Sequence, residues 1–238
     1  MSKIYVTGDT HGTYDRAKLN TKIFKDQKDL TKNDYVIICG DVGMIWNSYT
    51  PKCPDRISSE DKACIKWYND KNFTTLFVDG NHENHYGLTK FPIEEWNGGK
   101  IHRISDTVIH LMRGQVFNID GKKFFTMGGA FSIDKLYRRE GYSWWPEEMP
   151  SQAEYEEAMA NLEKNNFEVD YVISHCCGTK YLHELFTYHD KADTLTRFFD
   201  HLEDDFNLKF KYWYFGHHHV DMNLDDKHTC LYRNVVEI

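Results

Sequence analysis

IYVTGDTHG, residues 4–12, joins a short apolar run to two side chains of the kind that bind metal ions. The run Ile4 to Thr7 consists mainly of branched and aromatic residues, which is typical of a buried strand. Asp9 and His11 follow it directly. Because alternate residues of an extended segment point the same way, both can face one centre or two neighbouring ones. The stretch therefore predicts a strand whose carboxyl end carries polar ligands, as in α/β folds.

The same pattern recurs at four later points, where strand-forming residues are followed by Asp, Asn or His. The runs are Tyr35–Cys39, Thr75–Val78, Tyr171–Ile173 and Tyr212–Phe215. The polar residues after them are Asp41, Asn81 with His82, His175, and His217 with His219. Since the carboxyl ends of strands in open α/β sheets form one ligand-binding rim, these residues should converge. Five such points in order indicate a two-metal centre rather than a chance collection of turns and core histidines.

Between these runs, apolar residues recur at helical spacing. Tyr14 to Phe24 can form a short helix, and Ser58 can open a second one. Ser151 with Glu154 forms a capping box that opens a third helix, and a fourth follows. The apolar positions that share a face in the last three are Cys64, Trp67 and Tyr68, then Tyr155, Ala158, Met159 and Leu162, then Leu195, Phe198, Phe199 and Leu202.

Turn signals complete the predicted architecture. Asp120 and Gly121 form a tight turn between the strands Gln115–Ile119 and Lys122–Met127. Strand-like runs follow one another from Thr107, which predicts a second, more antiparallel sheet, and a closing hairpin is expected around Asp225 and Asp226. We therefore expect one domain over residues 1–238, with an α/β fold of two sheets flanked by helices.

Composition narrows the classes of function. The formal net charge of −8 over 238 residues argues against a broad basic face for long nucleic acid, whereas short phosphorylated ligands are compatible with it. No signal-like segment follows Met1, and no apolar run approaches the roughly 18 residues of a membrane span. We therefore expect a cytoplasmic protein with no membrane partner. Its six cysteines, which include no Cys-x-x-Cys pair, are expected to be reduced and to carry no chemistry.

The predicted centre suits phosphate-ester cleavage. Such cleavage needs the anion neutralised, hydroxide generated near neutral pH and the departing oxygen stabilised, and two adjacent divalent cations can do all three. Asp9 and Asp41 offer two negative charges against four positive ones, so the site should attract an anionic substrate. Imidazoles with carboxylates and the Asn81 amide favour Mn, Fe, Zn, Co or Ni over Mg or Ca, and Mn is our working choice.

The order of these motifs resembles that of the calcineurin-like metallophosphoesterase superfamily over nearly the whole chain. The matching residues are Gly8-Asp9-Thr10-His11-Gly12, Gly40-Asp41, Gly80-Asn81-His82-Glu83, His175 and Gly216-His217-His218-His219. The resemblance implies that one metal ion is held by Asp9, His11, Asp41 and His219. It implies that the other is held by Asp41, Asn81, His175 and His217, so that Asp41 bridges the two ions.

The resemblance also implies a fold and a mechanism. The fold would be a four-layer α/β/β/α sandwich of two mixed sheets flanked by helices. A hydroxide that bridges the metal ions would attack phosphorus in line, with His82 near the leaving-group oxygen. Since a His beside a phosphate can be cationic and protonate a leaving alkoxide, we predict that His82 is catalytic. A purely structural imidazole is the alternative.

This chain differs from one branch of the superfamily in where a phosphate-binding arginine can come from. Its serine/threonine protein phosphatases carry an Asp and an Arg after the second motif, where this chain has Met44 and Ile45. The segment Ser132 to Trp145 is dense in aromatic and cationic residues, and its Arg138 and Arg139 are the predicted substrate contacts. Its tryptophans could stack on a base. The alternative is a loop anchored by buried tryptophans, with its arginines solvated or ion-paired.

Hydrolysis of a small phosphomonoester or phosphodiester is the function that these residues favour, and a nucleotide-like substrate is one candidate. The sequence leaves two alternatives open. One is a catalytically degenerate relative that uses the same fold for protein contacts, and the other is a serine/threonine protein phosphatase.

Overall fold

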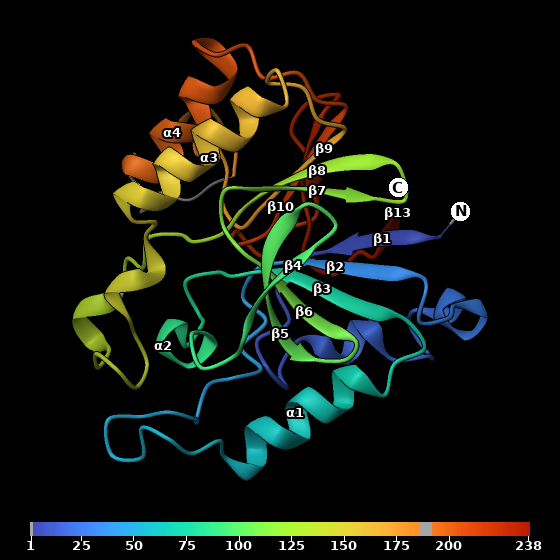
Figure 1. Cartoon of the computed structure of the whole chain (residues 1–238), viewed down its shortest axis with the longest axis vertical. Helices are drawn as coiled ribbons and strands as arrows, with labels where there is room; N and C mark the ends of the chain where they lie inside the picture. Colours follow the sequence, from blue (N-terminus) through green and yellow to red (C-terminus); the bar gives the residue numbers. More distant parts are fainter. Residues whose placement is uncertain (1, 186–191) are drawn as a thin grey trace.

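The computed structural model describes residues 2–185 and 192–238, which form two β-sheets flanked by helices (Figure 1). The strands of the first sheet are β1 Ile4–Thr7, β2 Tyr35–Cys39, β3 Thr74–Val78, β4 Ile93–Trp96, β5 Gly99–Ser105, β6 Val108–Leu111 and β13 Val236–Glu237. Those of the second sheet are β7 Gln115–Ile119, β8 Lys122–Met127, β9 Tyr171–Ser174, β10 Tyr212–Phe215, β11 Met222–Asn223 and β12 His228–Cys230. The first sheet has the order β13-β1-β2-β3-β6-β5-β4, and the second has the order β11-β12-β10-β9-β8-β7.

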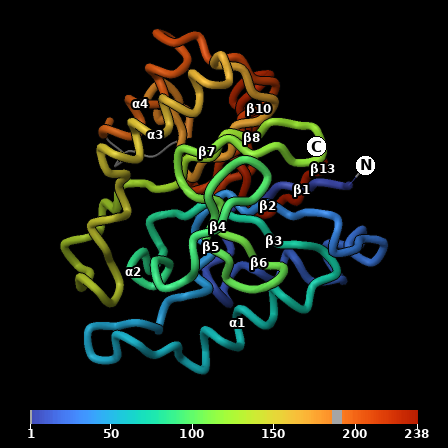
Figure 2. Tube along the Cα trace, viewed as in Figure 1, coloured from blue at the N-terminus to red at the C-terminus, as the bar shows by residue number. Residues whose placement is uncertain are grey.

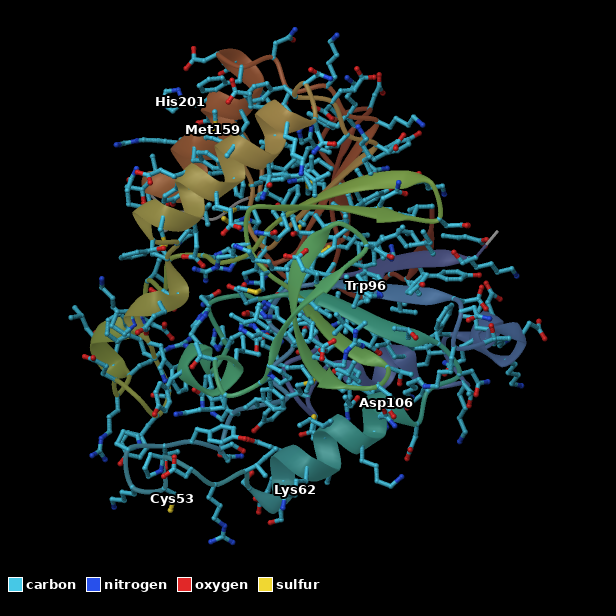
Figure 3. The ribbon with its side chains drawn as sticks, viewed as in Figure 1. Cys53, Lys62, Trp96, Asp106, Met159 and His201 are labelled. Carbon is cyan, nitrogen blue, oxygen red and sulfur yellow. The ribbon has the colours of Figure 1, made fainter. Side chains whose placement is uncertain are left out.

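The three long helices lie on the outer faces of the sheets. The α-helices are α1 Ser59–Asn69, on the first sheet, α2 His85–Leu88, and α3 Gln152–Lys164 with α4 Thr194–Asp204, both on the second sheet. The 3-10 helices are η1 Arg16–Leu19, η2 Lys25–Asp29, η3 Lys135–Tyr137, η4 Pro146–Glu148 and η5 Thr179–Tyr181. In Figure 3, Lys62 of α1 and His201 of α4 lie at opposite ends of the view, on either side of the sheets. Within the described ranges, no helix combines the length and the apolar character that crossing a membrane requires.

Three apolar clusters separate these layers. Between the two sheets, Val6 and Ile37 of the first pack in one cluster with Phe124 and Ile173 of the second. On the outer face of the first sheet, the cluster includes Tyr5, Val36, Cys64, Tyr68 and Phe77. On the outer face of the second sheet, it includes Phe125, Val172, Ala158, Leu162, Leu195 and Phe199. Alternate residues of β1, β2, β8, β9 and β10 therefore enter different clusters. The prediction of a four-layer α/β/β/α sandwich with two mixed sheets is confirmed.

Local signals predicted several elements correctly. The Asp120-Gly121 turn has φ angles of 52° and 81°, and it joins β7 to β8 as predicted. Ser58 caps α1 by accepting a hydrogen bond from the amide of Asp61, and Ser151 with Glu154 forms the predicted capping box of α3. A helix over Thr194–Asp204 and a closing hairpin of β11 with β12 are also present.

Two predictions about secondary structure are wrong. Tyr14 to Phe24 forms no α-helix, only the 3-10 turn η1. Two of its carbonyls are bonded from outside, because Gln27 Nε2 donates to those of Leu19 and Phe24, both at 2.9 Å. The second sheet is also not mainly antiparallel, since β8 with β9, β9 with β10, and β10 with β12 pair in parallel. Helices α3 and α4 return the chain across the sheet, which is the connection that parallel strands require.

The chain passes from the first sheet to the second between β6 and β7 (Figure 2). Near the other end, β13 pairs antiparallel with β1, with Tyr5 opposite Glu237. Strands β1 and β13 thus lie side by side in both views (Figures 1 and 2). This arrangement puts the carboxyl ends of β1, β2 and β3 near those of β9 and β10.

Candidate metal centre

Five parallel strands from two sheets end at the same place. Asp9, Asp41 and Asn81 follow β1, β2 and β3 of the first sheet. His175 follows β9 of the second sheet, and the segment with His217 and His219 follows β10. Side chains that are up to 210 residues apart in the sequence therefore share one site.

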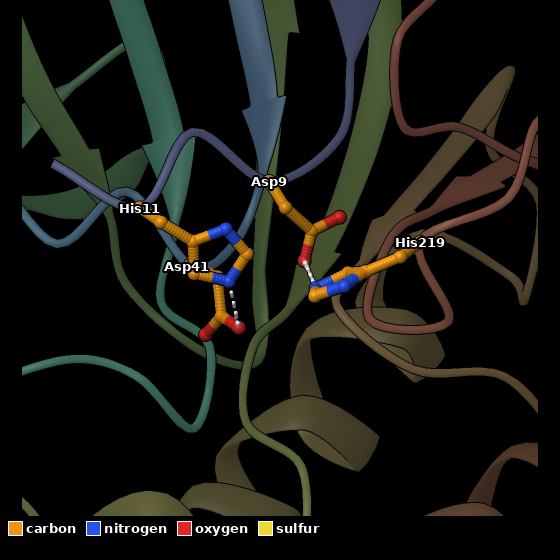
Figure 4. Close-up of side chains that lie close together, drawn as sticks. All are labelled: Asp9, His11, Asp41 and His219. Atoms are coloured by element: carbon orange, nitrogen blue, oxygen red, sulfur yellow. Dashed lines mark hydrogen bonds and ion pairs between the residues drawn. The ribbon is translucent and has the colours of Figure 1, made fainter. Parts of the chain in front are cut away.

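Four of these side chains form a compact cluster (Figure 4). Asp9, His11, Asp41 and His219 each offer one ligand atom, and these atoms all lie within 4.8 Å of one another. His11 Nε2 lies 3.2 Å from Asp41 Oδ2, and His219 Nε2 lies 3.8 Å from Asp9 Oδ1. The two carboxylates are buried, while the side chain of His219 is 48% exposed. Two carboxylates and two imidazoles suit a divalent transition-metal ion.

The other predicted ligands lie beside this cluster. His175 Nε2 is 3.3 Å from Asp41 Oδ1 and 3.1 Å from Asn81 Oδ1. Its Nδ1 lies 2.7 Å from the carbonyl oxygen of Cys39, so Nε2 is directed at the site. The His217 ring lies 5.0 Å from the His175 ring, between centroids. The structure thus brings all seven predicted ligands together, with Asp41 between the two groups.

Glycines in the motifs make room for side chains from other strands. A Cβ on Gly80 would collide with the Asp41 carboxylate and the His175 ring. A Cβ on Gly216 would collide with the carboxylate of Asp9 and the carbonyl of Cys39. The glycines before Asn81 and His217 therefore leave room for ligands that come from other motifs, which explains why Gly accompanies Asn and His at these two positions.

The backbone at the site is held in an unfavourable conformation. His11, Asp41, His217 and His219 have φ angles of 41°, 49°, 67° and 53°. Left-handed backbone costs a non-glycine residue on the order of 1 kcal/mol or more, and such residues gather at functional sites. The surrounding hydrogen bonds hold it: the amide of His82 donates to Asp41 Oδ1 at 2.7 Å, and the amide of His217 donates to both Asp9 oxygens at 3.1 Å.

Charge inside the cluster shifts the pKa values of its members. Burial favours the neutral form of His11 and His175, but the Asp41 carboxylate outweighs it and raises the pKa of each to about 9. Burial also opposes ionisation of Asp41, yet His175 and His11 hold its pKa well below the ordinary value. In Asp9, burial raises the pKa. The metal-free protein therefore holds protonated histidines at neutral pH.

Metal binding should release protons at neutral pH. A metal ion binds neutral imidazole, whereas His11 and His175, each with a pKa of about 9, carry protons below that pH. Affinity should therefore fall as the pH drops from about 9 toward 6, and proton release should cease well above 9. Titration calorimetry with Mn²⁺ at pH 7.5, in two buffers of different ionisation enthalpy, measures the release. Equal heats in both buffers would contradict the prediction.

An open cavity of about 260 Å³ borders the cluster. Its lining combines residues of the ligand motifs with the segment 131–138, and consists of Asp41, Asn81, His82, His217, His218 and His219 with Phe131, Ser132, Ile133, Asp134 and Arg138. Of the two predicted arginines, Arg138 lines the cavity and Arg139 does not. The Arg139 guanidinium lies 4.1 Å from the Tyr142 ring centroid. Trp145 is buried against Trp46, with ring centroids 5.4 Å apart, and is not in the lining.

His82 lies at this cavity and contacts Arg138. The guanidinium nitrogens lie 3.2 Å from Nδ1 and 2.9 Å from Nε2 of the imidazole, and Arg138 also donates to Asp134 Oδ2 at 2.8 Å. The Trp46 ring is stacked 6.3 Å from the His82 ring. Burial lowers the pKa of His82 and Arg138 lowers it further, although Asp41 opposes them. At neutral pH, the His82 imidazole is thus neutral and lies beside the Arg138 guanidinium.

The sequence patterns missed a buried ion pair under the Gly80-Asn81 motif. Asp79 Oδ2 accepts a hydrogen bond from Arg113 Nε at 2.9 Å, and Asp79 Oδ1 lies 3.1 Å from His110 Nε2. Burial would raise the pKa of Asp79, but Arg113 and His110 hold it well below its ordinary value. Arg113 also donates to the carbonyl of Glu147 at 2.9 Å. A signal existed for Asp79, which follows β3 directly, but none pointed to Arg113.

Comparisons with known proteins place the fold and these motifs in context. A family model described as calcineurin-like phosphoesterase matches residues 2–221. No curated protein matches the sequence. Among solved structures, the chain is similar to phosphopantetheinyl hydrolase from Mycobacterium tuberculosis, with 12% identity and a TM-score of 0.42, over 97% of this chain and 88% of that one.

Proposed function

The chain belongs to the calcineurin-like phosphoesterase family and is a metal-dependent, phosphoesterase-type hydrolase, and we propose that it hydrolyses a small phosphomonoester or phosphodiester with two divalent metal ions. One ion would be held by Asp9, His11, Asp41 and His219. The other would be held by Asp41, Asn81, His175 and His217. We propose further that residues 1–238 act as one metallophosphoesterase domain.

The observation that carries this proposal is the convergence of all seven predicted ligands beside an open cavity. Neighbouring ligand atoms of the carboxylates, imidazoles and amide lie 3.1–3.8 Å apart in four pairs, and they form a donor set for transition metals, of which Mn is our choice. Divalent ions bound there would neutralise a phosphate and supply a water molecule that is acidic enough to attack at neutral pH. Because this donor set is complete, we propose an active enzyme rather than a catalytically degenerate scaffold.

Arg138 is the proposed phosphate contact from outside the metal motifs. Its side chain is 13% exposed and is oriented by Asp134, whose Oδ1 lies 2.7 Å from Nε. An entering phosphate would offer this guanidinium a stronger partner than a neutral imidazole. The same negative charge would favour protonation of His82, which could then donate a proton to the departing oxygen. Met44 and Ile45, where protein phosphatases have Asp and Arg, are buried and leave this role to Arg138.

Replacing Arg138 by Met should raise KM for phosphate esters by about 10-fold to 100-fold, because a charge-assisted hydrogen bond contributes roughly 1.5–3 kcal/mol. Arg139→Met is the matched control. It removes the same charge one residue away, from a guanidinium that lies on the Tyr142 ring outside the cavity lining. Steady-state kinetics on one monoester measures both variants. Equal KM values for Arg138→Met, Arg139→Met and the wild type would exclude Arg138 as the phosphate contact.

Apolar side chains at the cavity support a substrate with an organic group of modest size. Phe131 and Ile133 are 37% and 54% exposed, and both line the cavity together with the metal motifs. A volume of about 260 Å³ is slightly below the range of typical small-molecule pockets. A nucleotide would find an aromatic face in Phe131 rather than in Trp145, which is buried. We therefore favour small esters over phosphoproteins.

The test of the function is a substrate panel with metal-stripped protein. The protein, reloaded with Mn²⁺, is assayed on an aryl phosphate monoester and an aryl phosphate diester, then on nucleotides and phosphopeptides. We expect metal-dependent hydrolysis of an aryl ester and faster reaction with a small natural ester than with a phosphopeptide. Elemental analysis of the same samples gives the metal content. Two bound ions without hydrolysis of any ester would support the scaffold alternative instead.

A further inference from the structure

Tyr232, near the end of the described chain, contacts His219 directly and His11 through Asp15. Its ring is stacked on the imidazole of His219, with centroids 4.8 Å apart and an interplanar angle of 13°. His219 needs such support, because its side chain is 48% exposed and its backbone is left-handed with φ 53°. Without the stacked ring, several orientations of this exposed imidazole would be open to it, and metal binding would have to fix one of them.

The hydroxyl of Tyr232 reaches the second histidine through a carboxylate. Tyr232 Oη donates to Asp15 Oδ1 at 3.0 Å, and Asp15 Oδ2 lies 2.8 Å from His11 Nδ1. The opposite ring nitrogen of His11, Nε2, faces Asp41 Oδ2 at 3.2 Å. A carboxylate on Nδ1 selects the tautomer with its proton there and leaves the Nε2 lone pair for a metal ion. Tyr232 therefore fixes Asp15, and Asp15 fixes His11.

The backbone of Tyr232 is anchored independently of its side chain. Its carbonyl accepts a hydrogen bond from Lys18, a buried lysine whose ammonium also donates to the carbonyls of Gly8 at 2.6 Å and Asp9 at 2.7 Å. Its amide donates to Asp221 Oδ1 at 2.8 Å. Changing the Tyr232 side chain should therefore leave the segment in place.

We propose that Tyr232 is a positioning residue for the metal cluster, which orients His219 by stacking and His11 through Asp15, and thereby sets the affinity for the metal ion held there. This inference rests on the metal-binding role proposed above. It assigns a function to a residue outside the ligand motifs, 217 positions from its hydrogen-bond partner Asp15. Partners that orient metal ligands typically change metal affinity about 10-fold to 100-fold.

Two variants separate the stacked ring from the hydroxyl. Tyr232→Phe keeps the ring and removes the hydrogen bond to Asp15, so it should weaken Mn²⁺ binding about 3-fold to 10-fold. Tyr232→Leu removes both contacts and should weaken binding about 10-fold to 100-fold. Affinity is measured by calorimetric titration of metal-stripped protein with Mn²⁺ alone, without substrate.

Tyr5→Phe is the matched control. Tyr5 Oη also donates to a carboxylate at 3.0 Å, in this case Glu237 Oε2, so the variant loses the same type of hydrogen bond. Tyr5 packs in the cluster on the outer face of the first sheet, and its variant should bind Mn²⁺ like the wild type. Thermal unfolding of each metal-free variant checks that the fold is retained.

A double variant tests the route through Asp15. Asp15→Asn should weaken Mn²⁺ binding, and adding Tyr232→Phe should change it little further, because both substitutions break one link. Wild-type affinity in both Tyr232 variants would overturn the inference and leave the proposed function intact. Additive effects of Asp15→Asn and Tyr232→Phe would overturn the part of the inference in which Tyr232 orients His11 through Asp15. A wild-type protein that binds no Mn²⁺ would overturn the metal proposal and this inference together.

Discussion

Replacing Asp41 by Asn should reduce kcat/KM for phosphate esters by at least about 1,000-fold. The carboxylate is buried and lies between the two groups of predicted ligands, 3.2 Å from His11 Nε2 and 3.3 Å from His175 Nε2. Removing its charge should weaken both metal sites at once, and metal ions stabilise the transition state by several kcal/mol. Since each 1.36 kcal/mol changes a rate tenfold, a loss of about 4 kcal/mol gives this factor.

The measurement pairs kinetics with metal content, so that loss of metal can be separated from loss of chemistry. Asp41→Asn keeps the shape of the side chain and its acceptor for the amide of His82, which limits damage to the fold. Asp26→Asn, at an exposed position of η2, is the control and should keep full activity. Asp41→Asn protein that retains both ions and more than about a tenth of wild-type activity would contradict a bridging role for Asp41.

Replacing Arg113 by Met should destabilise the fold by about 3–5 kcal/mol. The substitution leaves the Asp79 carboxylate buried without its cation, and the side chains of both partners are 5% or less exposed. It also removes donors to the carbonyls of Glu147 and Glu148, which connect the Gly80-Asn81 motif to η4. For a chain of this size, the thermal midpoint should drop by roughly 6–20 °C.

Two further variants decide whether the buried pair is responsible. Arg103→Met breaks the ion pair of Arg103 with Glu94 at the surface, 2.5 Å from Nε to Oε2, and should cost less than about 1 kcal/mol. Asp79→Leu combined with Arg113→Met removes both charges and should recover most of the stability. Urea unfolding of metal-free protein measures all three. Equal losses for Arg113→Met and Arg103→Met would show that burial does not strengthen the pair.

Patterns within a few residues predicted the strands and the convergence of ligands. Tyr35–Cys39 and Tyr212–Phe215 have the predicted bounds, because a short branched or aromatic run between polar residues is a strong local signal. The parallel pairing in the second sheet could not be predicted from local patterns, since it depends on where α3 and α4 return the chain. The predicted helix over Tyr14 to Phe24 is wrong for a similar reason, because the side chain of Gln27, outside the segment, bonds two of its carbonyls.

The contacts that support the site were beyond the reach of sequence patterns. Arg138 and Arg139 are adjacent, and only the folded chain separates the one that meets His82 from the one that meets Tyr142. Asp79 and Arg113 are 34 positions apart, with no common motif. Such pairs are formed by the packing of whole sheets, whereas the local period of a strand reports only which of its faces is buried.

The pairing of β13 with β1 has a consequence for synthesis of the protein. The strand that leads to Asp9 gains its outer neighbour only from residues 236–237, and His219 and Tyr232 also come late in the chain. A nascent chain on the ribosome can therefore display Asp9, His11 and Asp41 long before translation supplies the residues that enclose them. Such distant contacts make folding slow, and the finished centre should form only after residues 232–237 have been synthesised.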